Sequence, residues 1–361
     1  MKQVLVAMSG GIDSLATVIL LQSQGFDVSC VTFVNWNDET PGVLRNASKS
    51  SAEDAAEDAR KLSEQLGCKH YTLNLCDDFE ETVIKPFCAS YLRGETPNPC
   101  CDCNKVFKFK HLCRFADELG IEKIATGHYA ELREENGRFF LRRAIDDWKD
   151  QSFMLWELGQ ETLKRCVFPL YNTTKDKARA IIAERGIVLG NTAKKESFDL
   201  CFIPDDDYAR FLLTRYPEME ERLKNGKLVD TQGKELGEHK GFPFYTVGQS
   251  KGLNYRYPSK LYIKKRDPET NTLVLSGKDE LYTETVVVDR LNFLKYKELK
   301  GNYRMFVRIR GKDDGMFADV EFLGNKAIAH FENPVFAPAK GQSAVFYEDK
   351  DVVCGGVMIE E

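Results

Sequence analysis

Three segments of the 361-residue chain combine residue types that could carry out chemistry. In the first, Ser9-Gly10-Gly11-Ile12-Asp13-Ser14, glycines and small polar side chains lie between an apolar run and a helical pattern. Glycines let the backbone approach a phosphate closely, and the free N–H groups at a helix N-terminus favour anions. The segment has neither the lysine of a Walker A loop nor GxGxxG spacing. It predicts a phosphate-binding loop, and the alternative is an ordinary strand-to-helix turn.

The second segment is a stiff loop from Thr96 to Asn104 that contains Cys100, Cys101 and Cys103. Two prolines restrict its backbone and remove two N–H donors. We expect a helix to begin near Asn104, and a cysteine just ahead of a helix can have a lowered pKa because the thiolate is favoured there. Half of a structural zinc site is the alternative, but the chain offers no second Cys-x-x-Cys pair and only five histidines.

The third segment is Ser197 to Ile203, in which Cys201 stands between apolar residues. A lone cysteine in such surroundings is more often an inert core residue than a reactive one. Taken by itself, this segment therefore predicts packing.

The elements that position these segments alternate through the first two hundred residues. Apolar runs and helical spacing predict strands at 4–7, 28–34, 71–75 and 123–126, and helices at 13–24, 52–66 and 106–119. Strands that alternate with helices indicate a parallel sheet with helices on both faces.

The pattern changes after about residue 205. A helical pattern covers 206–223, and short alternating runs then follow at 262–264, 273–275, 285–288, 305–308 and 343–347. Such runs predict small antiparallel sheets or a barrel. We expect a nucleotide-binding catalytic domain at 1–205, a small central domain at 206–280 and a β domain at 281–361.

Composition restricts the setting of the protein. The 51 Lys and Arg residues against 56 Asp and Glu give a net charge of −5, which argues against nonspecific nucleic-acid binding and a polybasic membrane anchor. The sequence has no run of eighteen apolar residues and no signal-peptide pattern. Eleven cysteines, an odd number, then fit a cytoplasmic, reducing setting in which they are buried, catalytic or metal-binding.

Together, the motifs SGGIDS, TPNPCCDCN and SFDLCFI closely resemble those of the tRNA-specific 2-thiouridylase family, and SGGIDS is similar to the PP-loop of ATP pyrophosphatases. The resemblance runs in order from residue 4 to residue 357, with further matching segments at 125–129, 149–152, 168–170, 244–249, 251–253 and 341–347. It implies an α/β protein: a PP-loop ATP pyrophosphatase-type parallel sheet with helices on both faces, a small central domain and a C-terminal antiparallel β-barrel.

The resemblance also implies site residues. The ATP site would comprise Ala7, Met8, Ser9, Gly10, Gly11, Ile12, Asp13, Ser14, Phe33 and Gly127, with Asp13 suited to a Mg²⁺ or water shell. Cys103 would be the catalytic nucleophile and Cys201 would carry the persulfide sulfur. The target base and the rest of the tRNA would contact Asn98, Pro99, Cys100, His128, Lys149, Asp150, Gln151, Arg308, Ile309 and Gln342.

The implied reaction uses ATP to replace the C2 oxygen of the wobble uridine with sulfur. The oxygen is first adenylated, and the Cys201 persulfide then delivers sulfur, which leaves a Cys103–Cys201 disulfide to be reduced. The implied partners are tRNA, of the Lys, Glu and Gln types, and a sulfur donor, either a cysteine desulfurase or a sulfur-relay protein. We expect a monomer. Residues 295–312 carry seven basic side chains against one acidic, which fits an RNA partner despite the negative total.

The sequence departs from the family pattern at a few positions. Cys100 stands where many members have Asp, so Cys100, Cys103 and Cys201 could hold an iron–sulfur cluster with one open iron site. We favour the alternative, in which Cys100 is a tolerated variant of a cluster-free enzyme. Ser250 replaces a common Arg. Gly311 follows Arg308-Ile309-Arg310, where an RYR-like stretch is usual, and both departures put details of tRNA contact in question.

Two other functions compete with this interpretation. A PP-loop ligase that acts on a small molecule, similar to argininosuccinate synthetase, would share SGGIDS but would need neither the cysteines nor a C-terminal β domain. An RNA-binding module with a degenerate nucleotide site is the second, and the intact Ser9, Asp13 and Ser14 argue against it.

Overall fold

The apolar run near the N-terminus becomes the middle strand of a five-stranded sheet in the computed structural model, which describes all residues except 1, 38, 44–51, 188–199, 204 and 360–361. The strand order is β3-β2-β1-β4-β7, and every pairing is parallel. The strands are β1 (Lys2–Ala7), β2 (Phe26–Val34), β3 (Lys69–Asn74), β4 (Lys123–Ala125) and β7 (Cys166–Val167). The four predicted strands are confirmed, and β7 is too short to leave an apolar pattern.

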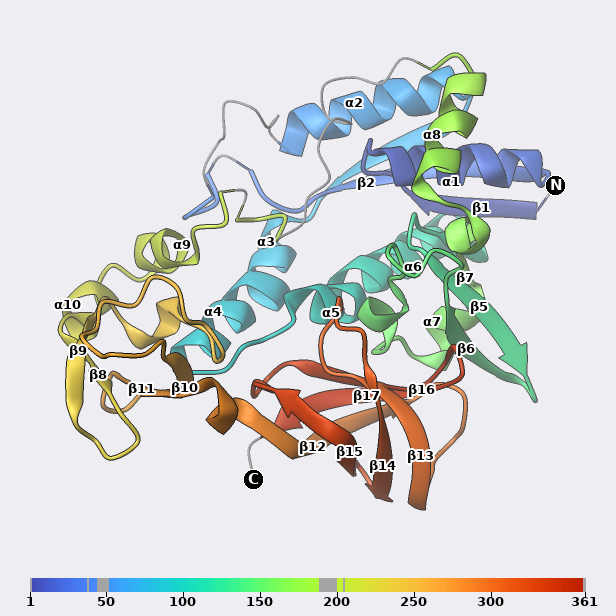
Figure 1. Ribbon diagram of the computed structural model, residues 1–361. Coiled ribbons are helices and arrows are strands. Elements are labelled where there is room, and N and C mark those ends of the chain that lie inside the picture. Colours follow the sequence, from blue (N-terminus) through green and yellow to red (C-terminus); the bar gives the residue numbers. More distant parts are fainter. Residues whose placement is uncertain (1, 38, 44–51, 188–199, 204, 360–361) are drawn as a thin grey trace.

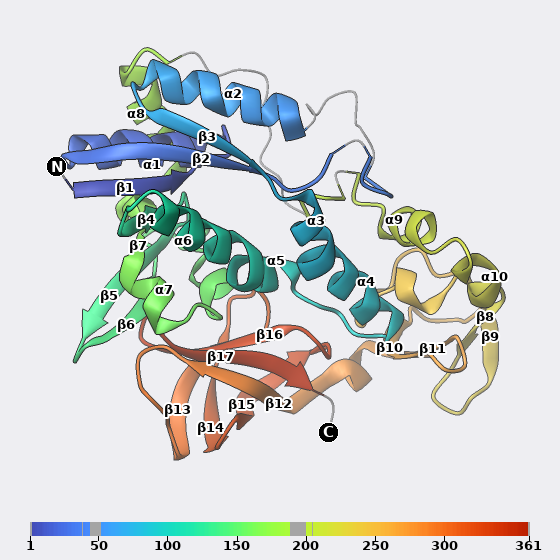
Figure 2. The same ribbon diagram turned by 180° about the vertical axis from the view of Figure 1, so that it is seen from behind.

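Helices cover both faces of this sheet, as predicted (Figure 1; Figure 2). One face packs against α1 (Ile12–Ser23), α2 (Ala52–Gln65) and α8 (Lys175–Glu184), and the other against α6 (Phe109–Glu118). Successive strand side chains point to opposite faces. Val4 and Val6 therefore belong to the core on the α1 side, whereas Leu5 packs into the core on the α6 side.

The chain between β3 and α6 forms two helical arms. The first contains α3 (Cys76–Phe79), the π-helical η1 (Glu80–Ile84) and α4 (Lys85–Leu92), and the second contains α5 (Pro99–Cys103) and the π-helical η2 (Asn104–Lys108), which leads into α6. The expected helix start near Asn104 is wrong. The helix begins at Pro99, because a proline's fixed φ and missing N–H suit the first helical turn.

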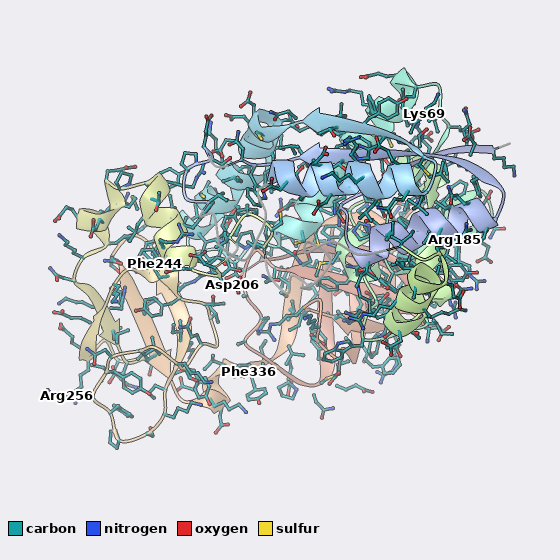
Figure 3. The ribbon with its side chains drawn as sticks, turned by 90° about the horizontal axis from the view of Figure 1, so that it is seen from above. Lys69, Arg185, Asp206, Phe244, Arg256 and Phe336 are labelled. Atoms are coloured by element: carbon teal, nitrogen blue, oxygen red, sulfur yellow. The ribbon has the colours of Figure 1, made fainter. Side chains whose placement is uncertain are left out.

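A small central unit follows the sheet domain. It contains α9 (Tyr208–Arg215), α10 (Met219–Leu223) and a four-stranded sheet in the order β10-β11-β8-β9, made of β8 (Gly226–Val229), β9 (Glu235–His239), β10 (Tyr262–Asp267) and β11 (Thr272–Ser276), with the short η6 (Phe242–Phe244) beside it. Seen from above in Figure 3, its Phe244 and Arg256 lie on the side of the molecule opposite Lys69 and Arg185 of the parallel-sheet unit.

The C-terminal unit is a closed antiparallel barrel, as predicted. After η7 (Lys278–Leu281), its strands are β12 (Tyr282–Phe293), β13 (Gly301–Arg308), β14 (Met316–Leu323), β15 (Lys326–Phe336), β16 (Ser343–Glu348) and β17 (Asp351–Ile359). The order is β12-β15-β14-β13-β16-β17, and the pairing of β17 with β12 closes it. Closure removes the exposed strand edges that an open sheet would present.

A hairpin of the parallel-sheet unit extends the barrel. Its strands are β5 (Ala130–Glu135) and β6 (Arg138–Arg143), and β6 pairs with β17 at Asp351. The Arg142 guanidinium also contacts the Asp351 carboxylate at 2.6 Å. The short elements η3 (Ser152–Leu155), α7 (Gln160–Arg165) and η4 (Pro169–Asn172) complete the connection back to the sheet. None of the helices in the described ranges is both long and apolar enough to cross a lipid bilayer.

Trp156 of the parallel-sheet unit lies against the barrel and bonds to it. Its indole N–H donates to Ser343 Oγ at 3.0 Å, and a Cβ added at Gly355 of β17 would lie 2.5 Å from the indole ring. The Trp156 carbonyl accepts from the Asn292 side chain of β12 at 2.7 Å. The two units therefore meet in a packed and hydrogen-bonded interface.

Candidate active site

The predicted phosphate loop joins β1 to α1 and is closed by its own serines. Ser14 Oγ donates to the Gly11 carbonyl at 3.0 Å and accepts from the Ser9 backbone N–H at 3.2 Å. Gly10 has φ +76°, in the left-handed region that favours glycine. The loop thus delivers the N-terminus of a twelve-residue helix, with its free N–H groups, to the carboxyl edge of the sheet.

Gly127 lies directly against this loop. A Cβ at Gly127 would approach the Asp13 carbonyl carbon at 2.9 Å and the Ser14 nitrogen at 3.0 Å. Gly127 follows β4, which pairs with β1. After β1 the chain adds β2 and β3 on one side of β1 and then β4 and β7 on the other, so the order of connection reverses between β1 and β4. In open α/β sheets, ligands bind in the crevice at such a switch point. The structure therefore brings the PP-loop residues and Gly127 together at a ligand-binding position.

Phe33, which is expected near the adenine, lies near the same edge of the sheet, where its ring packs against other aromatic side chains. It lies in β2, and its ring makes edge contacts with Phe107 at 6.2 Å and with His111 at 6.3 Å between centroids. Phe33 is partly buried.

Asp13 is bound by two residues that the sequence analysis did not single out. Lys175 Nζ lies 2.7 Å and 2.8 Å from the two carboxylate oxygens, and the Tyr129 hydroxyl donates to one of them at 2.7 Å. Lys175 is the first residue of α8, whose N-cap is Thr174. Lys175 thus brings an ammonium group to this loop from a distant helix, whereas a Walker A loop carries its lysine within the loop.

The cysteine-containing loop is held by all three units of the protein. Its polar contacts are Thr96 N–H to the Lys340 carbonyl at 2.8 Å, Arg266 to Thr96 Oγ1 at 2.6 Å, Gln342 to the Pro97 carbonyl at 3.3 Å, and Asn104 to the Met154 carbonyl at 2.9 Å. Lys340 and Gln342 belong to the barrel unit, Arg266 to the central unit and Met154 to the sheet unit. The loop is therefore fixed only when the three units are assembled.

The three cysteines of this loop have different environments. Cys101 is fully buried, close to the Phe153 carbonyl and Ser343 Oγ, so its role is packing. Cys100 is exposed, and Cys103 is partly exposed. Burial raises the pKa of the Cys103 thiol to about 11, although nearby Lys108 acts in the opposite direction. The expected lowering of a cysteine pKa here is wrong for Cys103, because the helix begins four residues earlier and the thiol lies inside it.

Cys201 lies near Cys103 and Cys100, although it comes from a distant part of the chain. Desolvation of the sulfur raises the pKa of the Cys201 thiol to about 12, and the proximity of Cys103 and Cys100 adds to the rise, while the residue as a whole is exposed. Its neighbour Phe202 is buried against Phe79 and Phe87, with ring centroids 5.8 Å and 5.3 Å apart. Ser197, Phe198 and Asp199 of the motif lie outside the described residues.

The described cysteines do not form a metal site. No group of three His, Cys, Asp or Glu side chains in the described ranges is arranged to hold a metal ion, and this includes Cys100, Cys103 and Cys201. The described arrangement of these thiols does not fit an iron–sulfur cluster.

Five of the residues expected to contact tRNA are buried, namely Pro99, His128, Asp150, Arg308 and Ile309. Asp150 accepts from the backbone N–H groups of Ala144 and Ser152 and lies 3.2 Å from the Arg308 guanidinium. Burial lowers the pKa of His128, whose ring stacks on Phe109. These side chains position their neighbours, and a direct contact with tRNA would require them to become exposed.

Lys149, Gln151 and Gln342 are partly exposed, and beside them Trp148 is 79% exposed. Exposed aromatic rings of this kind offer a surface on which unpaired bases stack. Trp148 was missed because a single tryptophan in a sequence gives no signal of its exposure.

The basic stretch 295–312 does not form one open surface. Lys295 Nζ contacts Glu348 at 2.5 Å and Asp351 at 2.8 Å, and Arg304 pairs with Asp319 and Glu332. Because Arg308 is also buried, much of the local positive charge is already neutralised within the barrel unit.

Comparison with known proteins gives matches along the whole chain. Family models described as a tRNA methyl transferase HUP domain, a tRNA methyl transferase PRC-barrel domain and an Aminomethyltransferase beta-barrel domain match residues 2–205, 212–277 and 283–359. A protein of Cytophaga hutchinsonii named tRNA-specific 2-thiouridylase MnmA is 40% identical over 355 residues, covering 98% of this chain and 96% of that protein. Proteins of the same name from Amoebophilus asiaticus and Salinibacter ruber are 42% and 41% identical, each covering 98% of this chain and 94% and 93% of their own length.

The close approach of Gly127 predicts a nucleotide-binding defect in Gly127→Ala. The added methyl group would push the phosphate loop away from β4, so nucleotide affinity should fall about tenfold, or about 1.4 kcal/mol. Calorimetric titration with ATP measures the change. Gly159→Ala is the matched control, because no atom lies within 4 Å of its Cβ position. Equal ATP affinity in the two variants would contradict the assignment of Gly127 to the nucleotide site.

The raised pKa of Cys103 predicts slow alkylation of the free protein. With a pKa of about 11 instead of 9.0, the thiolate fraction at pH 8, and with it the rate of reaction with iodoacetamide, should be about a hundredfold lower. The rate should rise as the pH increases toward 11. Peptide mass spectrometry can follow Cys103 directly, and Cys103 alkylation as fast as that of a free cysteine at pH 8 would contradict the buried environment.

Proposed function

This chain belongs to the tRNA-specific 2-thiouridylase family, and from that premise we propose that it uses ATP to replace the C2 oxygen of the wobble uridine of tRNA with sulfur. The observation that carries the proposal is that Cys103 packs against the same apolar cluster as Phe202, the chain neighbour of Cys201. A phosphate loop alone fits many ATP-dependent reactions, whereas a phosphate loop together with a pair of neighbouring thiols in the same protein is suited to sulfur transfer.

The first step that we propose is adenylation. The uridine C2 oxygen attacks the α-phosphate of ATP, the bond between the α- and β-phosphates breaks, and pyrophosphate leaves. Free N–H groups at the start of α1 are placed to stabilise the negative charge that develops on the phosphates. The Asp13 carboxylate is a ligand type that Mg²⁺ prefers, and a bound Mg²⁺ would supply further charge neutralisation.

We propose that Lys175 neutralises phosphate charge once ATP is bound. In the free protein its ammonium group contacts both Asp13 oxygens, so the two charges hold each other in place. A phosphate group that enters beside Asp13 would compete for the ammonium group, and a cation on the nucleotide would compete for the carboxylate. Lys175 thus has the charge and the position to stabilise pyrophosphate as it leaves.

The second step is sulfur transfer to the adenylated carbon. Cys201 carries the transferable sulfur as a persulfide, and two routes reach the product. In one, Cys103 attacks the Cys201 sulfur and releases hydrosulfide, which attacks C2. In the other, the terminal persulfide sulfur attacks C2, and Cys103 then displaces it from Cys201. Both routes expel AMP, form a Cys103–Cys201 disulfide and require a thiol reductant for the next turnover.

We also propose the substrates, the sulfur donor and the oligomeric state. The substrates are tRNAs of the Lys, Glu and Gln types. A cysteine desulfurase or a sulfur-relay protein supplies the sulfur. The enzyme acts as a monomer in the cytoplasm. Exposed Trp148 and partly exposed Lys149 support RNA contact near the hairpin. Asn98, Pro99 and Cys100 face the target base at the start of α5.

Pyrophosphate release separates this function from its competitors. We expect the wild type to release pyrophosphate from ATP only when tRNA is present, whereas a small-molecule ligase would need its small substrate and a binding module would release none. Lys175→Met should lower the tRNA-dependent rate about 10²–10³-fold, because one charge-stabilising donor is lost. Lys177→Met, two residues along α8, is the matched control. Release by Lys175→Met at the wild-type rate would remove Lys175 from the mechanism, and release without tRNA would contradict the function.

A further inference from the structure

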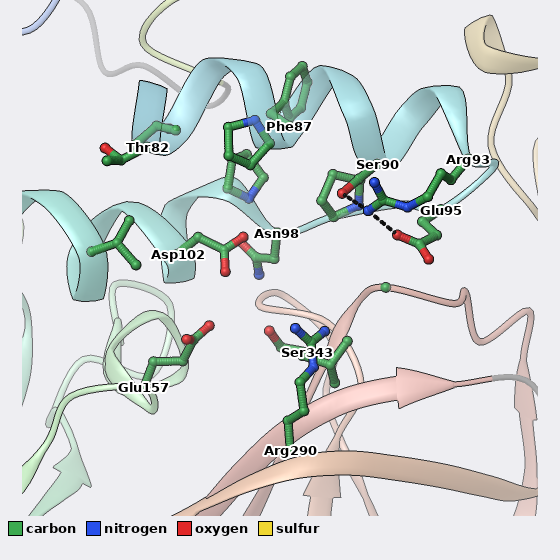
Figure 4. Close-up of a pocket in the computed structure, with 17 residues that line it drawn as sticks. Thr82, Phe87, Ser90, Arg93, Glu95, Asn98, Asp102, Glu157, Arg290 and Ser343 are labelled. Atoms are coloured by element: carbon green, nitrogen blue, oxygen red, sulfur yellow. Dashed lines mark hydrogen bonds and ion pairs between the residues drawn. The ribbon is translucent and has the colours of Figure 1, made fainter. Parts of the chain in front are cut away.

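A cavity of about 370 Å³ lies between the first helical arm, α5 and the barrel. This volume is within the range of about 300–1,000 Å³ that small-molecule sites occupy. Val83 and Phe87 form apolar parts of its wall, and Asn98 lies at its rim. Figure 4 shows Asp102 and Glu157 directed into the space from one side and Arg290 directed into it from the barrel.

The cavity is separate from the cysteines on which the proposed chemistry depends. Pro99, Asp102 and Val106 line it, at a spacing that places all three on one side of the continuous helix. Neither Cys100 nor Cys103 is among the lining residues. The cavity therefore lies against α5 without including either thiol.

Both acidic and basic side chains line the cavity, and the carboxyl groups of Asp102 and Glu157 face into it. Glu157 pairs with Lys105 at 3.2 Å. Burial and the neighbouring Glu157 raise the pKa of Asp102 to about 6, while Arg290 acts to lower it. The guanidinium of Arg290 has no hydrogen bond or ion pair shorter than 4 Å within the described ranges, so its donors are available to a ligand. A ligand for this space is therefore neutral. It has a flat apolar face that packs against the apolar walls, and it carries N–H groups that donate hydrogen bonds to the carboxylates.

We propose that this cavity binds a second nucleobase of the same RNA, that of a nucleotide next to the wobble uridine, through the N–H groups on the edge of the base. The inference rests on the proposed function and deepens it, because it assigns a site that reads sequence beside the target base. Asp102 and Glu157 accept from the base N–H groups, Arg290 donates to a base carbonyl or ring nitrogen, and Phe87 and Val83 contact its apolar face. Carboxylates at a base edge discriminate between bases in this way.

Other occupants fit the cavity less well. The Asp102 and Glu157 carboxyl groups repel a phosphate placed beside them, so they favour a neutral base over the RNA backbone at that end of the cavity. The position of the cavity beside Asn98 and Pro99 also matters, since the proposed function places these residues against the wobble base. An RNA that places its wobble base against the start of α5 has its next nucleotide within reach of the cavity.

The test is a coupling experiment on RNA binding. Anticodon stem-loop RNAs, intact or with one nucleotide beside the wobble position made abasic, are titrated by fluorescence anisotropy at fixed salt. The proteins are the wild type, the double variant Asp102→Asn/Glu157→Gln and the variant Arg290→Gln. Glu81→Gln is the control, because it removes an exposed acidic charge from the neighbouring helical arm without lining the cavity.

We expect one abasic replacement to weaken wild-type binding about tenfold, the loss typical of a missing base contact. The double variant should bind intact RNA about tenfold more weakly, with no further loss for that abasic RNA, and Arg290→Gln should show the same non-additivity. Glu81→Gln should behave as the wild type. Equal ratios of intact to abasic affinity in all the proteins would overturn the proposal, as would a wild type that is indifferent to every abasic replacement.

Incubation of the same RNAs with the wild type, ATP, Mg²⁺ and a sulfur donor tests the proposed function separately. Formation of 2-thiouridine by the wild type without coupling at the cavity would reject the second base site and leave the function standing. Coupling without 2-thiouridine would support the base site and reject the function. A wild type that binds none of the RNAs would reject both.

Discussion

The loop that carries Cys100 and Cys103 is hydrogen-bonded to all three units of the protein, and the rest of the site depends on this attachment. Thr96 alone accepts from Arg266 of the central unit and donates to the Lys340 carbonyl, while Asn104 bonds to the sheet unit. Removing one partner from a buried hydrogen bond leaves a polar group unsatisfied, at a cost of about 1–3 kcal/mol. The position of the thiols is therefore a property of the assembled molecule.

The parallel sheet positions the other part of the candidate site, the phosphate loop. The reversal of the connection order between β1 and β4 creates the crevice. Because Gly127 has no side chain, the phosphate loop can lie directly against it. The Asp13–Lys175 pair holds opposite charges ready in the free protein. Cys103 and Cys201, in contrast, have raised pKa values, so the free protein holds them as thiols. The nucleotide site is thus charged before the reaction, whereas the thiols are not.

The sequence allowed the alternation of strands and helices, the phosphate loop and the barrel to be predicted, because periodicity and glycine spacing are local signals. It did not reveal that Lys175 pairs with Asp13, since that contact joins distant segments. A proline between polar residues is typical of a loop, which is why Pro99 is expected in one, although a proline also suits a first helical turn. Burial of Arg308 against Asp150 could not be anticipated either, because a basic residue in a strand is usually exposed. The domain limits, the site residues and the sulfur donor remain predictions.

The most direct measurement is mass spectrometry of nucleosides from tRNA incubated with the purified protein, ATP, Mg²⁺ and a cysteine desulfurase with cysteine. The account predicts 2-thiouridine at the wobble position with the wild type, and none with Cys103→Ser or Cys201→Ser, although both variants still bind ATP. Normal formation of 2-thiouridine by either variant would contradict the roles given to the two thiols.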